Sequence, residues 1–542
     1  MSCTADVKNN NTPPPDEGNK ANKVKPNIIL MLVDDLGYSD FGCYGSEVET
    51  PNIDRIATNG IRFRTFYNNA RSSPSRAALL TGLYPHQVGY GALDAVPGYP
   101  SYQAYANDKN VFIPEVIKDA GYFSVMTGKW HLGNQYGVTP VTRGFDQSIN
   151  GSAGGFYFYN DPAINNGTAL YLNDAKVSVN DPRLPANWYS TDMWVEEGLN
   201  MIDEAVNRGQ PFFWYLAHNA PHFPLQAPAA TIAKYKGKYS VGYDPIRNAR
   251  FKRQQELGLF LPTDKLTPRN PSPENKKWEN MTAAEREIAD NRMAIYAAVI
   301  DEIDKSTGKV LAYLQEKGIL DNTLIMILSD NGGNAETAFP GRYEGSNPGG
   351  VNSLVWLGAP WADVANTPFF LYKHHAHEGG CNTPMIISWP NGIDHNLNGT
   401  IIKYMFGHIL DVMPTLVEIT GAKYPAKRGN VDILPMEGIS LVPCFSGRSP
   451  NRTKPIIMEH EGNKMIRDGN WKAVQEYKEP LWMLYDMDKD PTEMNDLATE
   501  YPDKLDELVS KYHTIATRIG VSEEIVFTVG KWYTPVADYL KD

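Results

Sequence analysis

The sequence has few cysteines, no long apolar run and no excess of positive charge. Its 542 residues include four cysteines, at positions 3, 43, 381 and 444, which do not resemble a disulfide framework. No apolar run reaches the roughly 18 residues that a membrane-spanning helix needs. The formal net charge of −12 disfavours a nucleic-acid-binding protein, because such proteins carry a basic face. We therefore expect neither a transmembrane segment nor a nucleic-acid partner.

What is present is the composition of an ordinary globular protein, preceded by a polar tail. Hydrophobic residues make up 42% of the chain and charged residues 21%. The stretch from Thr4 to Lys25 is rich in Asn, Pro and Lys and has almost nothing to bury, so residues 1–25 are expected to form a disordered tether. Met1-Ser2-Cys3 before such a tether is typical of a bacterial lipoprotein start trimmed of its signal peptide, with a lipid anchor at Cys3. The alternative is an ordinary chain end with an unmodified cysteine.

Beyond the tail, short apolar runs alternate with helical patterns. This alternation predicts an α/β fold with a large, mostly parallel central sheet and helices on both faces. The longest helical pattern runs from Thr282 to Lys317, where Thr282 and Glu285 form a capping box. The expected strands of the sheet are Asn27–Val33, Phe123–Met126, Pro211–Ala217, Thr323–Ser329 and Pro384–Ser388.

The sequence pattern changes near residue 425. Four short strands with tight turns, from Ile456 to Tyr485, predict a small antiparallel sheet, and the helix predicted from Pro502 packs on it. We thus expect a catalytic domain over residues 26–425 and a smaller C-terminal α+β subdomain over 426–542. The charged, Pro-punctuated segment at about 230–277 is expected to be an insertion over the main domain.

Polar residues follow several of the predicted strands, at the edge of a parallel sheet where active sites form. Asp34 and Asp35 end the first strand, and Asp330 and Asn331 end another almost 300 residues later. Three carboxylates and an amide oxygen make a hard, oxygen-only site, which suits calcium or magnesium and not zinc or copper. For Asp34-Asp35 alone, an anionic loop or a helix cap is the alternative.

Two further strand ends carry histidines. Lys129 and His131 follow the strand at Phe123, and their i, i+2 spacing on an extended segment would point both to one side. His222 stands in Ala220-Pro221-His222-Phe223-Pro224, where the flanking prolines fix the loop, as a positioned acid requires.

The segment Ser72-Ser73-Pro74-Ser75-Arg76, followed by Leu80-Thr81-Gly82, resembles the signature of type I sulfatases, in the bacterial arylsulfatase style of the alkaline-phosphatase-like superfamily. Taken alone it also fits a Ser-rich helix N-terminus. The resemblance extends from about residue 26 to 500. In this family the first signature residue, Cys or Ser, is oxidised after translation to formylglycine, so Ser72 would be the precursor of the nucleophile and a formylglycine-generating enzyme would be a partner.

The resemblance also implies roles for the other residues. Asp34, Asp35, Asp330 and Asn331 would hold one calcium ion, with magnesium the less favoured alternative. Lys129, Lys373 and Arg76 would neutralise the sulfate oxygens. His222 would protonate the leaving alcohol, and His131 would take the proton whose loss releases sulfate.

One departure from the family pattern stands beside Lys373. The motif Glu378-Gly379-Gly380 is usually followed by x-Arg-x-Pro, but here Cys381-Asn382-Thr383-Pro384 follows, and the arginine is missing. Between Lys373 and this motif lie three histidines, at positions 374, 375 and 377. They would either tune the choice of substrate or be solvated loop residues.

The resemblance implies a sulfuric ester hydrolase acting on a carbohydrate or aryl sulfate in the periplasm, at the cell surface or outside the cell. Related enzymes with a similar signature hydrolyse phosphate or phosphonate esters, which is one alternative. A protein in which Ser72 stays unmodified, and which binds sulfated glycans without cleaving them, is another. A serine that replaces a natural cysteine is a third.

Overall fold

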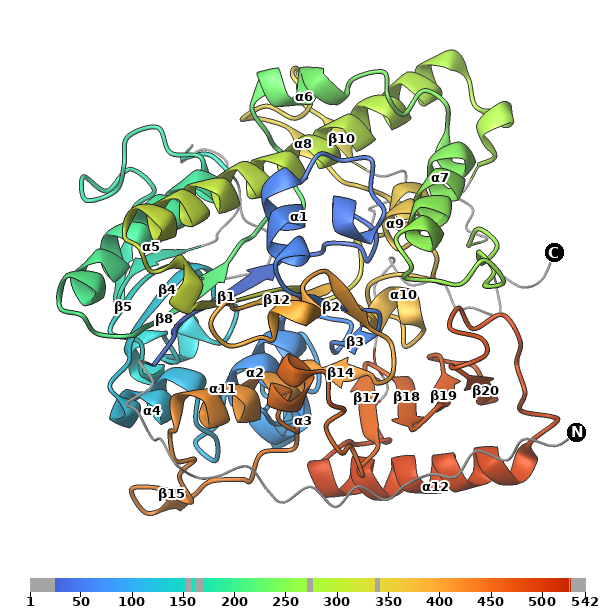
Figure 1. Ribbon diagram of the computed structural model, residues 1–542. Coiled ribbons are helices and arrows are strands. Elements are labelled where there is room, and N and C mark those ends of the chain that lie inside the picture. Colours follow the sequence, from blue (N-terminus) through green and yellow to red (C-terminus); the bar gives the residue numbers. More distant parts are fainter. Residues whose placement is uncertain are drawn as a thin grey trace, which may run out of the picture.

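The computed structural model describes residues 25–152, 158–160, 169–270, 276–336, 342–525 and 527 (Figure 1). The expected tether up to residue 24, with Cys3, lies outside the described residues. Among the described helices, none is both long enough and apolar enough to cross a membrane.

A ten-stranded mixed sheet forms the centre of the molecule, in the order β13-β2-β12-β9-β1-β8-β4-β5-β6-β7. Its five middle strands are parallel, as predicted: β9 (Thr323–Ser329), β1 (Asn27–Val33), β8 (Phe212–Ala217), β4 (Phe123–Lys129) and β5 (Gln147–Gly151). The outer strands are β2 (Ile61–Phe63), β6 (Leu170–Leu172), β7 (Ala175–Val177), β12 (Met385–Ser388) and β13 (Thr400–Ile402).

The strand expected at Pro384–Ser388 is present as β12, but it runs antiparallel to β9 and not parallel to it. The chain leaves β9 at its carboxyl end and comes back to the sheet at that same end. There the short helix α10 (Glu378–Cys381) lies beside the β9 exit, since Gly332 N–H donates to Gly380 O at 3.0 Å. A strand that re-enters the sheet at the end where its neighbour left must run in the opposite direction.

Both faces of the sheet are covered by helices, because alternate residues of β1 enter two different cores. Ile29 and Met31 pack into one core with α1 (Pro51–Thr58), α5 (Ser190–Asn207) and α8 (Ala283–Glu316). Ile28 and Leu30 pack into the other, with α2 (Ser72–Thr81), α4 (Ile113–Ile117) and α11 (Val412–Thr420). Figure 1 shows these two helical layers above and below the strands.

The predicted capping box starts α8. Glu285 N–H donates to Thr282 Oγ1 at 3.2 Å, and Thr282 N–H donates to Glu285 Oε2 at 2.7 Å. In the segment expected to be an insertion, α6 (Ala229–Tyr235) contacts α8, and α7 (Tyr243–Glu256) contacts α9 (Ala359–Ala365).

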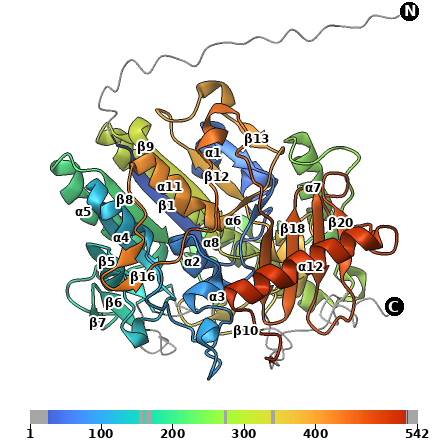
Figure 2. The same ribbon diagram turned by 90° about the horizontal axis from the view of Figure 1, so that it is seen from below.

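The predicted C-terminal sheet is confirmed as four antiparallel strands: β17 (Ile456–His460), β18 (Asn463–Asp468), β19 (Trp471–Gln475) and β20 (Met483–Asp486). The helix α12 (Pro502–Ile519) packs across β17, β18 and β19 (Figure 2). The remaining short elements are α3 (Pro85–Val88) and the strand pairs β3 (Phe66–Tyr67) with β14 (Gly407–His408), β10 (Tyr343–Glu344) with β11 (Leu354–Val355), and β15 (Lys427–Arg428) with β16 (Val431–Asp432).

Candidate active site

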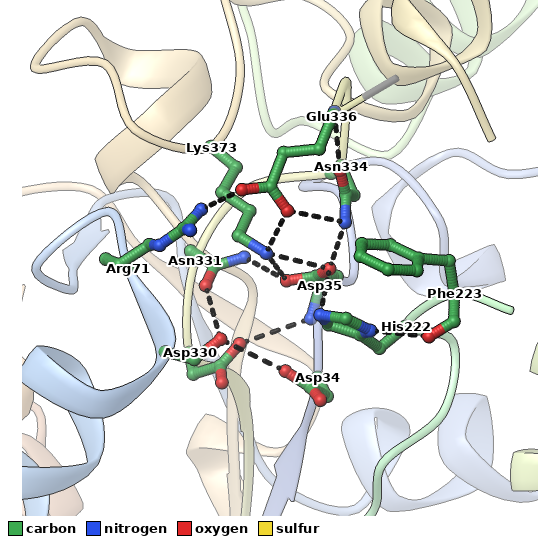
Figure 3. Close-up of polar contacts among 12 residues, drawn as sticks. Asp34, Asp35, Arg71, His222, Phe223, Asp330, Asn331, Asn334, Glu336 and Lys373 are labelled. Atoms are coloured by element: carbon green, nitrogen blue, oxygen red, sulfur yellow. Dashed lines mark hydrogen bonds and ion pairs between the residues drawn. The ribbon is translucent and has the colours of Figure 1, made fainter. Parts of the chain in front are cut away.

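Polar residues from four parallel strands meet at the carboxyl edge of the central sheet (Figure 3). Asp34 and Asp35 follow β1, and Asp330 and Asn331 follow β9. The chain turns sharply at Asp35, whose φ of 65° lies in the left-handed region, and its N–H donates to Asp330 Oδ1 at 3.2 Å. These two pairs of residues, almost 300 residues apart in the sequence, are therefore in direct contact.

Ser72 is the first residue of α2, and its side chain points at this acidic group. Ser72 Oγ lies 3.3 Å from Asp34 Oδ1 and 3.2 Å from Asn331 Oδ1. The residue is only 3% exposed. The positive end of the helix macrodipole lies at the same point, which favours negative charge on a group bound there.

Two lysines neutralise the first two carboxylates. Lys129 Nζ lies 2.9 and 2.6 Å from the oxygens of Asp34, and Lys373 Nζ lies 2.9 Å from Asp35 Oδ1. Lys129 can sit here because β4 approaches β8 at Gly128, where an added Cβ would lie 1.8 Å from Ala217 O. Burial raises the pKa of Asp35, but the charges of His222 and Lys373 outweigh burial and hold that pKa well below its ordinary value.

His222 is oriented by its own loop. Its Nδ1 lies 2.7 Å from Phe223 O, so the proton on that nitrogen is donated to the carbonyl, and Nε2 faces Asp35 Oδ2 at 3.4 Å. Burial lowers the pKa of His222 to about 4, against the opposing effect of Asp35. Nε2 is thus the nitrogen that can exchange a proton with a bound molecule.

His131 faces the same space, although not in the way that its sequence spacing predicts. The strand β4 ends at Lys129, and His131 has a left-handed φ of 57°, so the two side chains are brought together by a turn and not by extended alternation. Among the described residues His131 Nδ1 has no hydrogen-bond partner. Burial and the nearby charges of Lys129 and Arg76 lower the pKa of His131 well below its ordinary value.

Arg76 does not reach the space where a substrate would bind, which corrects the expectation that it contacts sulfate oxygens. It is completely buried, and its guanidinium donates to Asp330 Oδ2 at 3.0 and 2.8 Å and to Lys129 O at 2.8 Å. Arg76 lies about one helical turn after Ser72, so it sits below the first turn of α2. Arg76 therefore fixes Asp330 and the end of β4.

These groups surround the floor of a cavity of about 390 Å³. Ser72, Lys129, His131, His222 and Lys373 all line it, whereas Arg76 does not. Asp34, Asp35, Asp330 and Asn331 lie beneath the floor and reach the cavity through the groups they contact.

The acidic residues fit a hard divalent cation. Asp34, Asp35 and Asp330 are buried and offer carboxylate oxygens, and Asn331 adds an amide oxygen. Burial and the adjacent Asp34 carboxylate raise the pKa of Asp330 to about 6, despite Arg76, so this cluster favours an added positive charge. Asp34, Asp35 and His222 also form a group with ligand atoms within 4.8 Å of one another, but the imidazole is a nitrogen donor and suits softer metals.

Comparison with known proteins agrees with this geometry. The sulfatase family profile matches residues 26–422, and the profile of the C-terminal region of N-sulphoglucosamine sulphohydrolase matches residues 369–517. The chain belongs to the sulfatase family.

Individual sulfatases match over most of the chain. An uncharacterized sulfatase of Schizosaccharomyces pombe is 34% identical, over 93% of this chain and 95% of that protein. The arylsulfatase of Klebsiella aerogenes is 35% identical, over 78% of this chain and 92% of that protein. The crystal structure of Ps i-CgsB in complex with k-i-k-neocarrahexaose superposes with a TM-score of 0.68 at 27% identity, covering 93% of this chain and 95% of that one. The protein is a sulfatase, an enzyme that hydrolyses sulfate esters.

In this sulfatase Asn382, which stands at the position of the missing arginine, and a lysine of the C-terminal sheet both contact Glu378. Asn382 holds Glu378 Oε2 at 2.8 Å, and Lys472 of β19 donates to Glu378 Oε1 at 2.6 Å and approaches Glu493 Oε1 at 2.7 Å. Tyr67 OH also donates to Glu378, at 2.8 Å. A buried lysine from the C-terminal sheet therefore supplies a positive charge beside the Glu-Gly-Gly turn.

The three histidines after Lys373 divide into two kinds. His375 and His377 are buried and contact Glu476 and Glu493 at 2.9 and 3.0 Å, so they are neither solvated nor exposed to substrate. His374 alone lies near the cavity, where it contacts Glu336 at 2.9 Å. The sequence spacing did not distinguish them.

Several residues near the cavity were not found from the sequence. Glu336 lines the cavity and contacts Lys373 Nζ at 3.2 Å, and it also pairs with Arg71, which lines the cavity next to Ser72. Asn334 donates to Asp35 Oδ2 at 2.5 Å. Arg71 immediately precedes the signature, and Asn334 and Glu336 follow Asp330-Asn331 within six residues. Proximity to a motif was the one signal that could have pointed to them.

Proposed function

We propose that this sulfatase hydrolyses sulfate monoesters of a carbohydrate, using a formylglycine made from Ser72 and one calcium ion held by Asp34, Asp35, Asp330 and Asn331. The observation that carries the proposal is the position of Ser72 Oγ. It lies within 3.3 Å of both Asp34 and Asn331, at the start of α2 and at the floor of the cavity. A nucleophile at this point is next to the proposed metal ligands and faces any ester in the cavity.

Formylglycine and calcium would each contribute a defined chemistry. When present, hydrated formylglycine at position 72 supplies an attacking hydroxyl and a second hydroxyl whose deprotonation allows sulfate to leave. When bound, calcium supplies positive charge next to the sulfate oxygens. An unmodified serine has no second hydroxyl and would remain sulfated after one reaction.

The side chains bind and orient the sulfate group. Lys129 and Lys373 line the cavity with their ammonium groups held by Asp34 and Asp35, so their positive charges are fixed before the substrate arrives. Arg76 holds Asp330 and the Lys129 carbonyl in place from below. It is a positioning residue.

The two histidines would transfer protons in different steps, His222 when the alcohol leaves and His131 when sulfate is released. Because its Nδ1 is bound to Phe223 O, His222 presents Nε2, the nitrogen from which we propose a proton passes to the departing ester oxygen. The negative charge of a bound sulfate ester favours the protonated imidazole that this step needs. His131 has an unpartnered Nδ1 and a lowered pKa, and we propose it as the base that accepts the proton when sulfate is released.

The substrate proposal rests on the cavity and on the relatives. The cavity floor is ringed by charged groups, while its wall includes Tyr90 and Tyr136, side chains that can pack against a sugar ring. The Ps i-CgsB structure is a complex with k-i-k-neocarrahexaose, which favours a carbohydrate, whereas the Klebsiella relative is named an arylsulfatase. An aryl sulfate is therefore the second substrate class to assay.

The domain organisation, the maturation partner and the location of the enzyme are also proposed. We propose a catalytic domain over residues 26–425 and a subdomain over 426–542, supported by the separate hydrogen-bonded sheet of β17 to β20. A formylglycine-generating enzyme would be the maturation partner. A site of action in the periplasm, at the cell surface or outside the cell, with a lipid anchor at Cys3, would match a substrate met as a polysaccharide.

Peptide mass analysis of active enzyme tests the nucleophile. The peptide that contains Ser72 should be about 2 Da lighter than the encoded peptide, allowing for hydration of the aldehyde. Parallel assays on sulfated sugars, an aryl sulfate and the matching phosphate esters test the ester class. Sustained turnover by enzyme in which Ser72 is entirely unmodified would overturn the mechanism, and faster turnover of phosphate than sulfate would overturn the substrate class.

A further inference from the structure

A second cavity of about 390 Å³ lies where the main domain meets the C-terminal sheet, and it shares no lining residue with the catalytic cavity. Its walls come from five separate stretches of chain. These are the segment after β2, the segment between β13 and β14, the segment before β17, the end of β18 with the turn into β19, and the segment after β20. Figure 1 shows β2, β14, β17 and β18 close to one another in this region.

Positive charge gathers around this cavity, although the whole chain carries −12. Its lining contains four basic side chains: Arg64, Lys403, Arg452 and Arg467. Among the described residues, two carboxylates lie beside them. Asp488 is an exposed residue of the lining, and Asp411 pairs with Arg452 from behind.

Two of the guanidinium groups have buried nitrogens with no hydrogen-bond partner in the part of the chain that the structure describes. Arg467 is 6% exposed, and its Nε and Nη1 make no hydrogen bond. Arg64 Nε is likewise buried without a partner. Neither side chain forms an ion pair among the described residues. Leaving a buried charge unpaired costs far more than pairing it, so such groups normally have a counter-ion.

Two other buried arginines of this protein are paired with carboxylates, unlike these two. Arg250 contacts Asp40 at 2.7 Å and Glu47 at 2.8 Å, and Arg76 contacts Asp330 at 2.8 Å. The difference is that Arg64 and Arg467 open onto a cavity, where an anion from solution can supply the missing charge.

An aromatic ring holds two of the arginines close together. The Cζ atoms of Arg452 and Arg467 lie 5.0 and 5.2 Å from the centre of the Phe406 ring, a distance typical of cation–π contacts. Phe406 is itself 7% exposed, so it is a fixed platform. Tyr404, which is 51% exposed, stands on the rim of the same cavity. Fixed guanidinium groups suit a tetrahedral oxyanion, since their planar forks match two of its oxygens.

We propose that this cavity is a second oxyanion site, separate from catalysis, which binds a sulfate or phosphate group, and that the group it takes is a sulfate of a glycan chain. Binding of the oxyanion follows from the unpaired arginines alone. Assignment of the source to a glycan rests on the proposed function, and the exposed Tyr404 supports it by offering a ring on which a sugar can pack.

The first test measures binding of the oxyanion itself. Thermal unfolding of the full chain is followed with inorganic sulfate or inorganic phosphate, against chloride at equal ionic strength. The wild type and the matched variant Arg253→Gln, an exposed arginine of α7, should be stabilised more than Arg467→Gln. Arg467→Lys, which keeps a charge, should retain part of the response if the variant folds normally. Equal stabilisation of wild type and Arg467→Gln would overturn the site.

The second test identifies the source of the oxyanion. A sulfated galactan polymer and its chemically desulfated form are the probes, and every protein carries Ser72→Ala so that the polymer is not cleaved. The double variant Arg64→Gln/Arg467→Gln should bind the sulfated polymer about tenfold more weakly than Arg253→Gln, a loss of about 1.4 kcal/mol. The desulfated polymer should not distinguish them. Equal affinity for the sulfated polymer would overturn the glycan assignment, whatever the first test shows.

A third measurement separates this site from the catalytic one. With Ser72 present, the double variant should hydrolyse a small aryl sulfate with an unchanged kcat/KM, because no residue of the second cavity lines the first. If kcat/KM for the aryl sulfate fell as much as the affinity for the polymer, the two sites would not be separate. Failure of the proposed function would instead appear as an inactive wild type or an unmodified Ser72, and would leave the response to inorganic anions intact.

Discussion

The catalytic cavity and the second cavity both concentrate positive charge in an acidic protein, but they differ in how far carboxylates pair it. Around the catalytic cavity Lys129 and Lys373 each contact a carboxylate, and Arg76 beneath it does the same. Around the second cavity Arg64 and Arg467 contact none among the described residues. The cations of the first arrangement are paired before a substrate arrives, whereas these two arginines of the second would gain a counter-ion only when an anion binds.

This difference separates two uses of charge. Paired charges are held in place, so they can act on a transition state without reorganising, and losing one member disturbs the others. An unpaired charge gains most of its stabilisation from a ligand, and losing it should affect binding alone. Substitutions in the two kinds of network should therefore differ in size and in kind.

The largest effect is expected for Ser72→Ala, which removes the proposed nucleophile from beside the paired charges. We expect kcat/KM to fall by about 10⁴-fold or more, because the remaining groups can bind sulfate but have no atom to attack it. The measurement is turnover of an aryl sulfate. Ser73→Ala is the matched control, since Ser73 also lines the cavity but makes no hydrogen bond through Oγ. A Ser72→Ala enzyme with a rate near that of the control would mean that the nucleophile lies elsewhere.

The next effect is expected for His222→Gln, which keeps a polar side chain but cannot deliver a proton. We expect kcat for a sugar sulfate to fall by roughly 10² to 10⁴, whereas an aryl sulfate with an acidic phenol should lose much less, because its leaving group needs no proton. His513→Gln, on α12 and 45% exposed, is the control. Equal losses on both substrates would show that His222 does not act on the leaving group.

Residues at the ends of predicted parallel strands could be placed from the sequence, whereas those positioned by side-chain packing or by distant partners could not. The runs ending at Asp34 and Asp330 have the apolar pattern of parallel strands, and their carboxyl ends meet at one edge, so their proximity could be expected. The placement of Arg76 away from the cavity could not, because it depends on which face of α2 packs on β9. His375 and His377 were indistinguishable from His374 in the sequence, since their partners Glu476 and Glu493 come from about 100 residues further on.

A third network, paired and lining neither cavity, tests whether pairing also stabilises the fold. Lys472 lies between Glu378 and Glu493, and all three are buried. Lys472→Met should lower the free energy of unfolding by about 3–5 kcal/mol, because two buried carboxylates lose their cation. Chemical denaturation measures this loss. Lys489→Met, which removes an exposed lysine paired with Asp486, should change little.

The same network predicts a pH dependence. Burial raises the pKa of Glu493, but Lys472 and His377 outweigh burial and lower that pKa to about 2, from an ordinary value of 4.5. A group with a depressed pKa contributes stability above its unfolded pKa, so this contribution is present above about pH 4.5 and is lost as the pH falls toward 2. Glu493→Gln should flatten this part of the stability curve. An unchanged acid response in that variant would assign the effect to other carboxylates.

The smallest effect is expected for Glu336→Gln, where a paired cation of the catalytic cavity is partly released. Glu336 contacts Lys373 and Arg71, two cations that face the cavity, and so competes with an incoming anion for them. Its removal leaves Arg71 without that carboxylate, like the arginines of the second cavity, while Lys373 keeps its contact with Asp35. We therefore expect inorganic sulfate to inhibit the variant about three- to tenfold more strongly, a change of about 1 kcal/mol. Weaker inhibition would show instead that Glu336 positions Lys373, and that in this cavity pairing aids binding as well as catalysis.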